Sequence, residues 1–160
     1  MAWSGTDTFK AKIGFGESRW ALVRPDGRRI RGAQYRCPHL SWPTGYVSMK
    51  CGACTIHLDG VATRSCQLPV KAAEGRASVT LEGLGTPDKP HPVQAAFIAE
   101  QALQCGYCTN GMIMQAAALI TAKPSPTEAD VGSMMNANLC RCGCQPRVVR
   151  AVLRATRKEA

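Results

Sequence analysis

The spacing of nine cysteines constrains this 160-residue chain more than any other feature. Two pairs, Cys51–Cys54 and Cys105–Cys108, have two residues between the cysteines, and a third pair, Cys140–Cys142, has one. In both of the longer pairs a glycine directly follows the first cysteine, which lets the backbone approach closely and point its amides at sulfur. Three such pairs in one short chain indicate that the thiols bind metal.

The nine cysteines are not expected to form disulfides. Their number is odd, and Met1–Lys12 lacks the apolar stretch of an export signal. Disulfide frameworks belong mainly to exported chains with an even number of cysteines. We therefore expect a cytoplasmic protein whose cysteines remain thiols or bind metal.

Cysteine spacing favours iron–sulfur binding over zinc, which remains the alternative. Zinc sites made of cysteines usually pair two CxxC motifs across a short, finger-like span. Here 31 residues separate Cys108 from Cys140, and they have the pattern of two helices. The plant-type [2Fe–2S] pattern is C-x4-C-x2-C followed by a distant cysteine, and Cys51, Cys54 and Cys66 match its last three ligands.

The first half of the chain has the pattern of β-strands. A hairpin is expected over residues 20–30 around an Asp-Gly turn, and a clearer one over Cys54–Cys66 around Asp59–Gly60. Another strand is expected over Ser78–Glu82. The stretch Gly83–Pro92, rich in proline and glycine, should be a linker.

The second half has the pattern of four helices. The first begins at Pro92, and the second, over Gly111–Ala122, is nearly all apolar and should be buried. A capping box at Ser125–Glu128 opens the third helix. Gln145 opens the fourth, whose valines should face the core and whose arginines should face solvent.

Together the two halves predict an α+β fold with two domains. Residues 1–84 should form a β-grasp domain like the plant-type ferredoxins, and residues 85–160 should form a four-helix-bundle [2Fe–2S]-binding domain. Each domain would contain one group of cysteines.

The formal net charge of +9 leaves nucleic acid open as a partner. Recognition of single strands would need aromatic side chains interleaved with the charge, yet aromatic residues make up only 6% of the chain. No apolar run approaches the roughly 20 residues of a membrane span. We therefore expect neither a nucleic-acid nor a membrane partner.

Four segments of the sequence carry a more specific signal. They are Cys51–Thr55, His91–Gln94, Gln104–Ile113 and Asn138–Gly143. Because of these segments, residues 51 to about 155 resemble the small iron–sulfur subunit of the xanthine oxidase family of molybdenum hydroxylases. That family includes aldehyde, carbon monoxide and N-heterocycle dehydrogenases. The resemblance implies two [2Fe–2S] clusters in one subunit of a heterotrimer.

The resemblance also implies ligands. The inner cluster, nearest molybdenum, would be held by the cysteines of the second half, which are Cys105, Cys108, Cys140 and Cys142. Gln104 and Cys142 occupy the positions at which the family touches the pterin. The outer cluster, nearer the flavin, would be held by Cys51, Cys54 and Cys66.

The partners implied by the resemblance are a medium subunit that binds FAD and a large subunit that binds the molybdopterin cofactor. Substrate chemistry would lie on the large subunit, with the aldehyde oxidase type favoured. This chain would pass single electrons from molybdenum through two clusters to FAD, in the cytoplasm or, through a partner's export signal, in the periplasm. The alternatives are a free-standing two-cluster ferredoxin and a zinc protein that binds nucleic acid.

The fourth ligand of the outer cluster is open. The family places a cysteine five residues before Cys51, where this sequence has Tyr46. Three explanations compete: Cys37 serves instead through a rearranged loop, Tyr46 or another group replaces the thiolate, or a sequence error within residues 13–50 hides the cysteine. A phenolate ligand would shift the cluster potential, because ligand identity sets it.

Other candidate ligands are expected to have ordinary roles. His57 should alternate out of its strand to the surface, and His91 should cap the helix that begins at Pro92. Cys144 is expected to be a bystander thiol, since the inner cluster already has its ligands. Methionines at helical spacing are expected to fill the core; they are Met112, Met114, Met134 and Met135.

Overall fold

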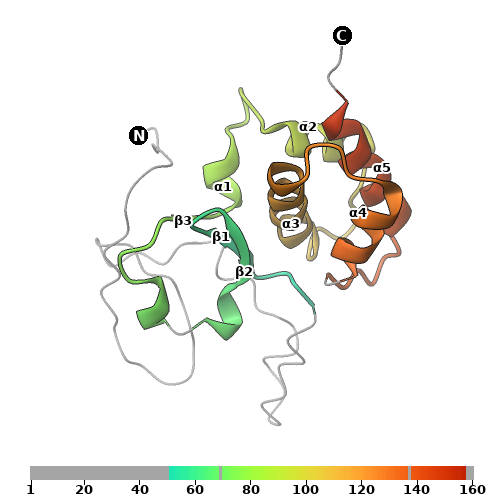
Figure 1. Ribbon diagram of the computed structural model, residues 1–160. Coiled ribbons are helices and arrows are strands. Elements are labelled where there is room, and N and C mark those ends of the chain that lie inside the picture. Colours follow the sequence, from blue (N-terminus) through green and yellow to red (C-terminus); the bar gives the residue numbers. More distant parts are fainter. Residues whose placement is uncertain (1–50, 69, 137, 158–160) are drawn as a thin grey trace.

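The computed structural model describes residues 51–68, 70–136 and 138–157 of the chain (Figure 1). The hairpin expected over residues 20–30 lies outside these residues, and so do the candidate ligands Cys37 and Tyr46. The described residues contain one small sheet followed by a set of helices, so the order of elements agrees with the α+β prediction.

A three-stranded antiparallel sheet with the strand order β2-β1-β3 follows the first pair of cysteines. Its strands are β1 (Thr55–Leu58), β2 (Val61–Arg64) and β3 (Ser78–Val79). The expected hairpin is confirmed, since β1 and β2 pair directly. The turn residues Asp59 and Gly60 have φ angles of 50° and 81°, the left-handed backbone that a two-residue turn of type I′ needs.

β1 is buried along its whole length, and the prediction that His57 points to the surface is wrong. The side chain of His57 is only 8% exposed, and its Nε2 donates a hydrogen bond to the backbone oxygen of Met114 at 2.7 Å. Met114 lies in α3 (Thr109–Ala122), which packs on β1. His57 lies on the face of the sheet that α3 covers, so its buried imidazole needs a hydrogen-bond partner inside the fold.

Short helical turns follow the strands. They are η3 (Ser65–Gln67) and η4 (Val70–Ala73) after β2, and α1 (Leu81–Leu84) after β3. The strand expected over Ser78–Glu82 is therefore shorter than predicted. The N–H of Gly83 donates to the oxygen of Thr80 at 2.9 Å, which turns the chain into α1 directly after the strand.

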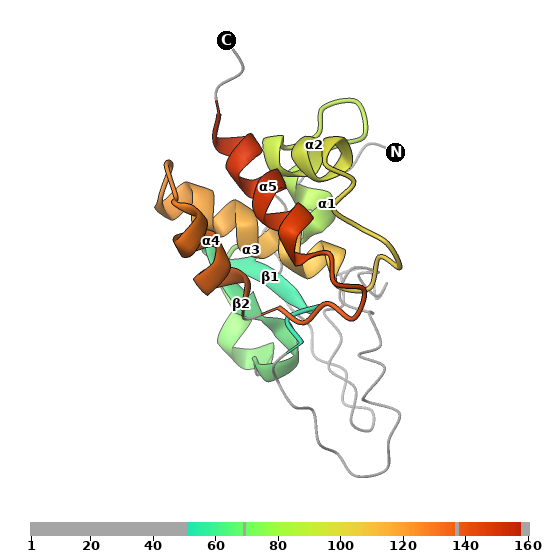
Figure 2. The same cartoon turned by 90° about the vertical axis from the view of Figure 1, so that its right-hand side faces the viewer.

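The four helices expected in the second half are present. They are α2 (Pro92–Ala99), α3, α4 (Glu128–Met135) and α5 (Gln145–Thr156). Figure 1 shows α3 at the centre, with the sheet on one side and α4 and α5 on the other. Seen from the side in Figure 2, β1 and β2 lie beneath the helices. The central helix therefore connects the two groups of elements that carry the cysteines.

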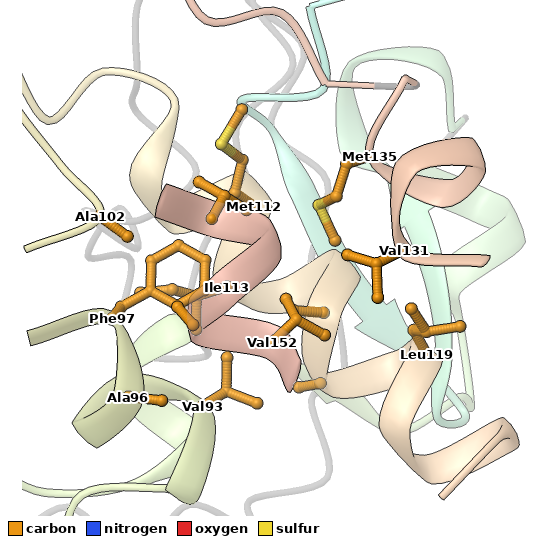
Figure 3. Close-up of a cluster of buried hydrophobic side chains, with 14 of the residues drawn as sticks. Val93, Ala96, Phe97, Ala102, Met112, Ile113, Leu119, Val131, Met135 and Val152 are labelled. Atoms are coloured by element: carbon orange, nitrogen blue, oxygen red, sulfur yellow. The ribbon is translucent and has the colours of Figure 1, made fainter. Parts of the chain in front are cut away.

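These helices enclose one hydrophobic core (Figure 3). Each contributes a side chain that is at most 1% exposed; these are Phe97, Met112, Val131 and Val152. Of the methionines expected in the core, Met134 is the exception, with 37% of its surface exposed and its sulfur accepting a hydrogen bond from Gln115. Met134 lies on the outer face of α4, whereas Val131 and Met135 of the same helix are buried.

His91 caps α2, as predicted. The ring Nδ1 of His91 accepts the backbone N–H of Val93 at 3.3 Å, and the backbone N–H of His91 donates to the side-chain oxygen of Gln94 at 2.8 Å. The pKa of His91 is lowered, mainly by burial and to a smaller extent by the nearby His57. The neutral imidazole that the cap requires is thus the favoured form.

α4 begins later than the capping box predicted at Ser125–Glu128. The N-cap is Thr127, whose Oγ1 accepts the N–H of Asp130 at 3.2 Å while the Asp130 carboxylate accepts the N–H of Thr127 at 2.7 Å. Lys123 pairs with the same carboxylate at 2.6 Å. The hydrogen bonds with Asp130 therefore place the N-cap at Thr127, two residues after the predicted Ser125.

Thr127→Ala should lower the free energy of unfolding by about 1 kcal/mol, because the substitution removes the N-cap acceptor. The matched control is Ser125→Ala, at the position that the sequence pattern favours and that lies outside the observed cap. It should change the free energy by less than about 0.5 kcal/mol. Urea unfolding followed by circular dichroism measures both, and equal effects would contradict the assigned cap.

Candidate metal centre

Two loops carry the thiols predicted for the inner cluster. One joins α2 to α3 and contains Cys105 and Cys108, and the other joins α4 to α5 and contains Cys140 and Cys142. Cys108 directly precedes α3, and Cys144 directly precedes α5. Both helices therefore begin at the thiols, where backbone N–H groups of the first turn have no partner within the helix.

The four thiols meet as two contacting pairs. The Sγ of Cys142 lies 3.4 Å from the Sγ of Cys105, and Cys108 and Cys140 lie close enough for each thiol to shift the pKa of the other. Among the described residues, no three His, Cys, Asp or Glu side chains are placed to hold a metal ion. A set of four thiols in two pairs nevertheless fits a [2Fe–2S] cluster, which takes four cysteine thiolates.

Burial and hydrogen bonding shift the pKa values of one of these pairs in opposite directions. Burial, together with the thiol of Cys140, raises the pKa of Cys108 to about 12. Burial also acts to raise the pKa of Cys140, but hydrogen bonds to its sulfur, led by the backbone N–H of Cys144, outweigh burial and lower it. The backbone is thus arranged to stabilise negative charge on the Cys140 sulfur, as a ligand to iron requires.

The outer thiols Cys51, Cys54 and Cys66 lie around the hairpin, and all three are half-buried. The N–H and the hydroxyl of Ser65 both donate to the backbone oxygen of Cys54, at 3.2 and 3.0 Å. Cys66 follows directly in η3. The pairing of β1 with β2 therefore brings Cys54 and Cys66 to the same end of the hairpin.

A junction at Gly52 joins the two cysteine regions. The backbone oxygen of Gly52 accepts hydrogen bonds from the N–H and the hydroxyl of Thr55, at 3.1 and 2.6 Å, and from the Nδ2 of Asn138 at 3.2 Å. The neighbouring oxygen of Cys51 accepts the N–H of Leu139 at 3.0 Å. The segment that leads into the CxC pair is thus bonded directly to the first CxxC loop.

Gly111 lets α3 lie against the same loop. A Cβ at this position would overlap the oxygen of Gly52 and would stand 3.0 Å from the Cα of Ala53. Sequence reasoning missed the roles of Gly111 and Asn138. For Gly111 the available signal was a glycine inside an otherwise apolar helix, which often marks a close backbone approach.

The inner site lies at the surface of the described residues. Gln104 and Cys105 are exposed, and so is Arg141 between the cysteines of the CxC pair. Three large apolar side chains in the same two loops are also exposed; they are Leu103, Tyr107 and Leu139. Apolar groups gathered beside thiols on a surface are typical of a contact site for another protein.

Known proteins place the chain in a family. Residues 80–153 match the family described as the [2Fe-2S] binding domain. One nicotinate dehydrogenase subunit of Pseudomonas putida is 57% identical over 106 residues, which cover 66% of this chain and 68% of that protein. The alpha subunit of the isoquinoline 1-oxidoreductase of Brevundimonas diminuta is 48% identical over 110 residues, 69% of this chain and 72% of that protein. The chain belongs to the small iron–sulfur subunits of the molybdenum hydroxylases.

A solved structure supports the same family. The small subunit is similar to part of the aldehyde oxidoreductase of Desulfovibrio gigas, with a TM-score of 0.64 and 36% identity, over 68% of this chain and 12% of that one. The resemblance predicted from the sequence is therefore confirmed, and the small subunit is part of an oxidoreductase. In the part of the chain that the structure describes, no helix is long and apolar enough to cross a bilayer.

Proposed function

We propose that this small subunit transfers electrons in a molybdopterin-dependent hydroxylase or dehydrogenase and holds two [2Fe–2S] clusters. The observation that carries the proposal is the meeting of four thiols from two separate loops, which are Cys105, Cys108, Cys140 and Cys142. Cys51, Cys54 and Cys66 would hold the outer cluster, with the fourth ligand, Cys37 or Tyr46, in the preceding part of the chain. When bound, the clusters would carry single electrons from molybdenum to FAD.

The residues of this chain would order and shield the ligands. Cys140 is 8% exposed, so the fold keeps water from its sulfur. Burial raises the pKa of the Cys140 thiol, but hydrogen bonding by the backbone of Cys144 and of Cys142 outweighs it and lowers that pKa, which favours the thiolate that iron binds. The Asn138 side chain bonds to the backbone oxygen of Gly52, and the N–H of Leu139 bonds to that of Cys51, so the two ligand loops are held together.

The exposed face of the inner site supports a partner of the large, molybdopterin-binding type. Gln104 lies on that face, where the resemblance places the pterin contact, and Cys142 is half-buried beside the exposed Cys105. A free-standing ferredoxin would have no use for the apolar groups around these thiols. The medium FAD subunit would meet the chain near the outer cluster, and the cytoplasmic location remains a prediction.

An N-heterocyclic substrate is favoured over an aldehyde for the whole complex. Nicotinate and isoquinoline are N-heterocycles, and the two relatives named for them are 57% and 48% identical to this chain. The aldehyde oxidoreductase is 36% identical. The aldehyde type predicted from the sequence therefore becomes the second candidate, and the substrate pocket of either type would lie on the large subunit.

The metal content of the full chain, purified without oxygen, tests the proposal. We expect a red-brown protein with visible absorbance and about four irons and four labile sulfides. About two irons would mean that the outer cluster is incomplete. A colourless protein with one zinc would overturn the proposal in favour of the zinc alternative. A loaded chain that does not bind the large subunit would support the free-standing ferredoxin.

A further inference from the structure

The outer face of α5 carries a stripe of arginines. In Figure 2 this helix lies at the front of the other helices, on the outside of the described part of the chain. Its opposite side packs in the core, where Val148 and Val152 are fully buried. Spacings of three and four residues place the arginines on one side of the helix. The arginine stripe consists of Arg147, Arg150, Arg154 and Arg157, all of them exposed.

One carboxylate of the chain itself lies on the arginine stripe. Glu100, the C-cap of α2, accepts hydrogen bonds from the Nε of Arg150 at 3.4 Å and from the Nη1 of Arg154 at 3.2 Å. The hydrogen bond from Arg154, and to a smaller extent that from Arg150, lowers the pKa of the Glu100 carboxyl. Neighbouring guanidinium groups on this face therefore favour a bound carboxylate.

The arginine stripe keeps a positive charge after this pairing. The Nη1 of Arg147 donates to the backbone oxygen of Gln101 at 3.3 Å, and that acceptor is uncharged. Within the described residues, no carboxylate pairs with Arg147 or Arg157. Four guanidinium groups against one carboxylate leave a net charge of +3 on the stripe. Since like charges on one helix face repel each other, carboxylates supplied by a partner would relieve that repulsion.

The arginine stripe adjoins the exposed face of the inner site. α5 begins shortly after Cys142, and Arg141 beside that cysteine is exposed as well. Arg147 bonds to Gln101, which leads into the loop that exposes Leu103. Protein interfaces combine a core depleted of charge with a polar rim, and they are enriched in arginine. The exposed apolar residues of the loops and the arginine stripe therefore fit the centre and the rim of one contact surface.

An acidic protein suits the arginine stripe better than a nucleic acid or a membrane. Unpaired nucleic acid is bound by aromatic rings that stack on its bases. Within the described residues, the exposed aromatic ring is that of Tyr107, which lies in a loop of the inner site and not along α5. A helix that binds a membrane surface inserts an apolar face among the lipids, whereas the apolar face of α5 is buried in the core.

We propose that the arginine stripe docks an acidic surface of the large, molybdopterin-binding subunit and speeds the assembly of the complex by electrostatic attraction. This inference rests on the proposed function, which supplies the partner. Charges at the rim of an interface mainly change the rate of association and its dependence on salt. The stripe would therefore steer the large subunit toward the exposed apolar residues Leu103, Tyr107 and Leu139.

The test measures the rate at which the cluster-loaded full chain associates with the large subunit, which is separated from the native complex. Arg147→Gln combined with Arg157→Gln removes two charges without touching the Glu100 pairs, and should slow association at low salt by about tenfold. Glu100→Gln removes the carboxylate from the stripe and should speed association by about threefold. Both differences should shrink at high salt, because ions screen exposed charges.

The matched control removes two positive charges elsewhere. Arg76 and Lys89 are exposed and lie outside α5, so Arg76→Gln combined with Lys89→Gln should leave the association rate nearly unchanged. Slowing equal to that of the α5 double variant would overturn the inference, because the effect would then follow net charge alone. Equal rates in the parent chain and the α5 double variant at low salt would overturn it too.

The remaining outcomes also decide. Should the α5 double variant fail to fold, Glu100→Gln takes its place: faster association supports the inference, and an unchanged rate overturns it. If the α5 double variant lost binding to polyuridine RNA or to phosphatidylserine vesicles but associated with the large subunit at the parent rate, the stripe would serve that polyanion and the inference would be wrong. A parent chain that does not bind the large subunit at any salt concentration would contradict the proposed function itself.

Discussion

Gly111→Ala is expected to lower the free energy of unfolding by about 1–3 kcal/mol and to reduce iron binding, although alanine is the better helix former. Inside a helix, alanine is favoured over glycine by about 1 kcal/mol. The added Cβ, however, would overlap the backbone oxygen of Gly52, and no flexible side chain is there to give way. Overpacking typically costs about 1–3 kcal/mol beyond such gains. α3 would have to separate from the loop that carries Cys51 and Cys54.

Gly132→Ala is the matched control. Gly132 lies in α4, and a Cβ there would have no atom within 4 Å. We expect this variant to raise the free energy of unfolding by about 0.5–1 kcal/mol. Urea unfolding and iron content should be measured for both. If Gly111→Ala were as stable as Gly132→Ala, the close approach of α3 to Gly52 would be wrong.

The second large effect is expected from Cys105→Ser. Cys105 is exposed, so serine should disturb the fold little, but the substitution removes one of the four thiols of the inner site. We expect the chain to lose about two of its four irons while keeping the outer cluster. Iron and labile sulfide per chain measure this loss.

The control for this loss is Cys144→Ser, which changes a thiol outside the set of four. It should keep all the iron, because Cys144 is a neighbour of the ligand sulfur and not itself a ligand. Iron lost from Cys144→Ser but retained in Cys105→Ser would show that the ligand set is wrong.

Local patterns predicted the elements whose cause is local. The apolar run Gly111–Ala122 lies within α3 (Thr109–Ala122), and α5 begins at Gln145 as expected. The Asp59–Gly60 pair marks the hairpin because few other residues accept its left-handed backbone. Periodicity and turn chemistry act over a few residues, so one sequence suffices to recognise them.

The features that were missed depend on distant neighbours. His57 is buried because α3 covers its strand. α4 starts late because Asp130, which pairs with Lys123, forms the capping box with Thr127. The hydrogen bond from Asn138 to Gly52 joins residues 86 positions apart, which no local pattern encodes.

The candidate site shows the same division. Spacing and resemblance grouped the four inner cysteines, and the structure brings them together as pairs. The burial of Cys144 in the same cluster as Cys140 could not be expected, because a fifth thiol has no place in a set of four ligands. Its position follows from where α5 begins, and that depends on the packing of Val148 in the core.

The EPR spectrum of the dithionite-reduced full chain tests the central claim most directly. Two distinct [2Fe–2S] signals are expected, one from each group of cysteines, and Cys105→Ser should remove one of them while leaving the other unchanged. A reduced chain without any iron–sulfur signal would contradict the electron-carrying role proposed for this small subunit.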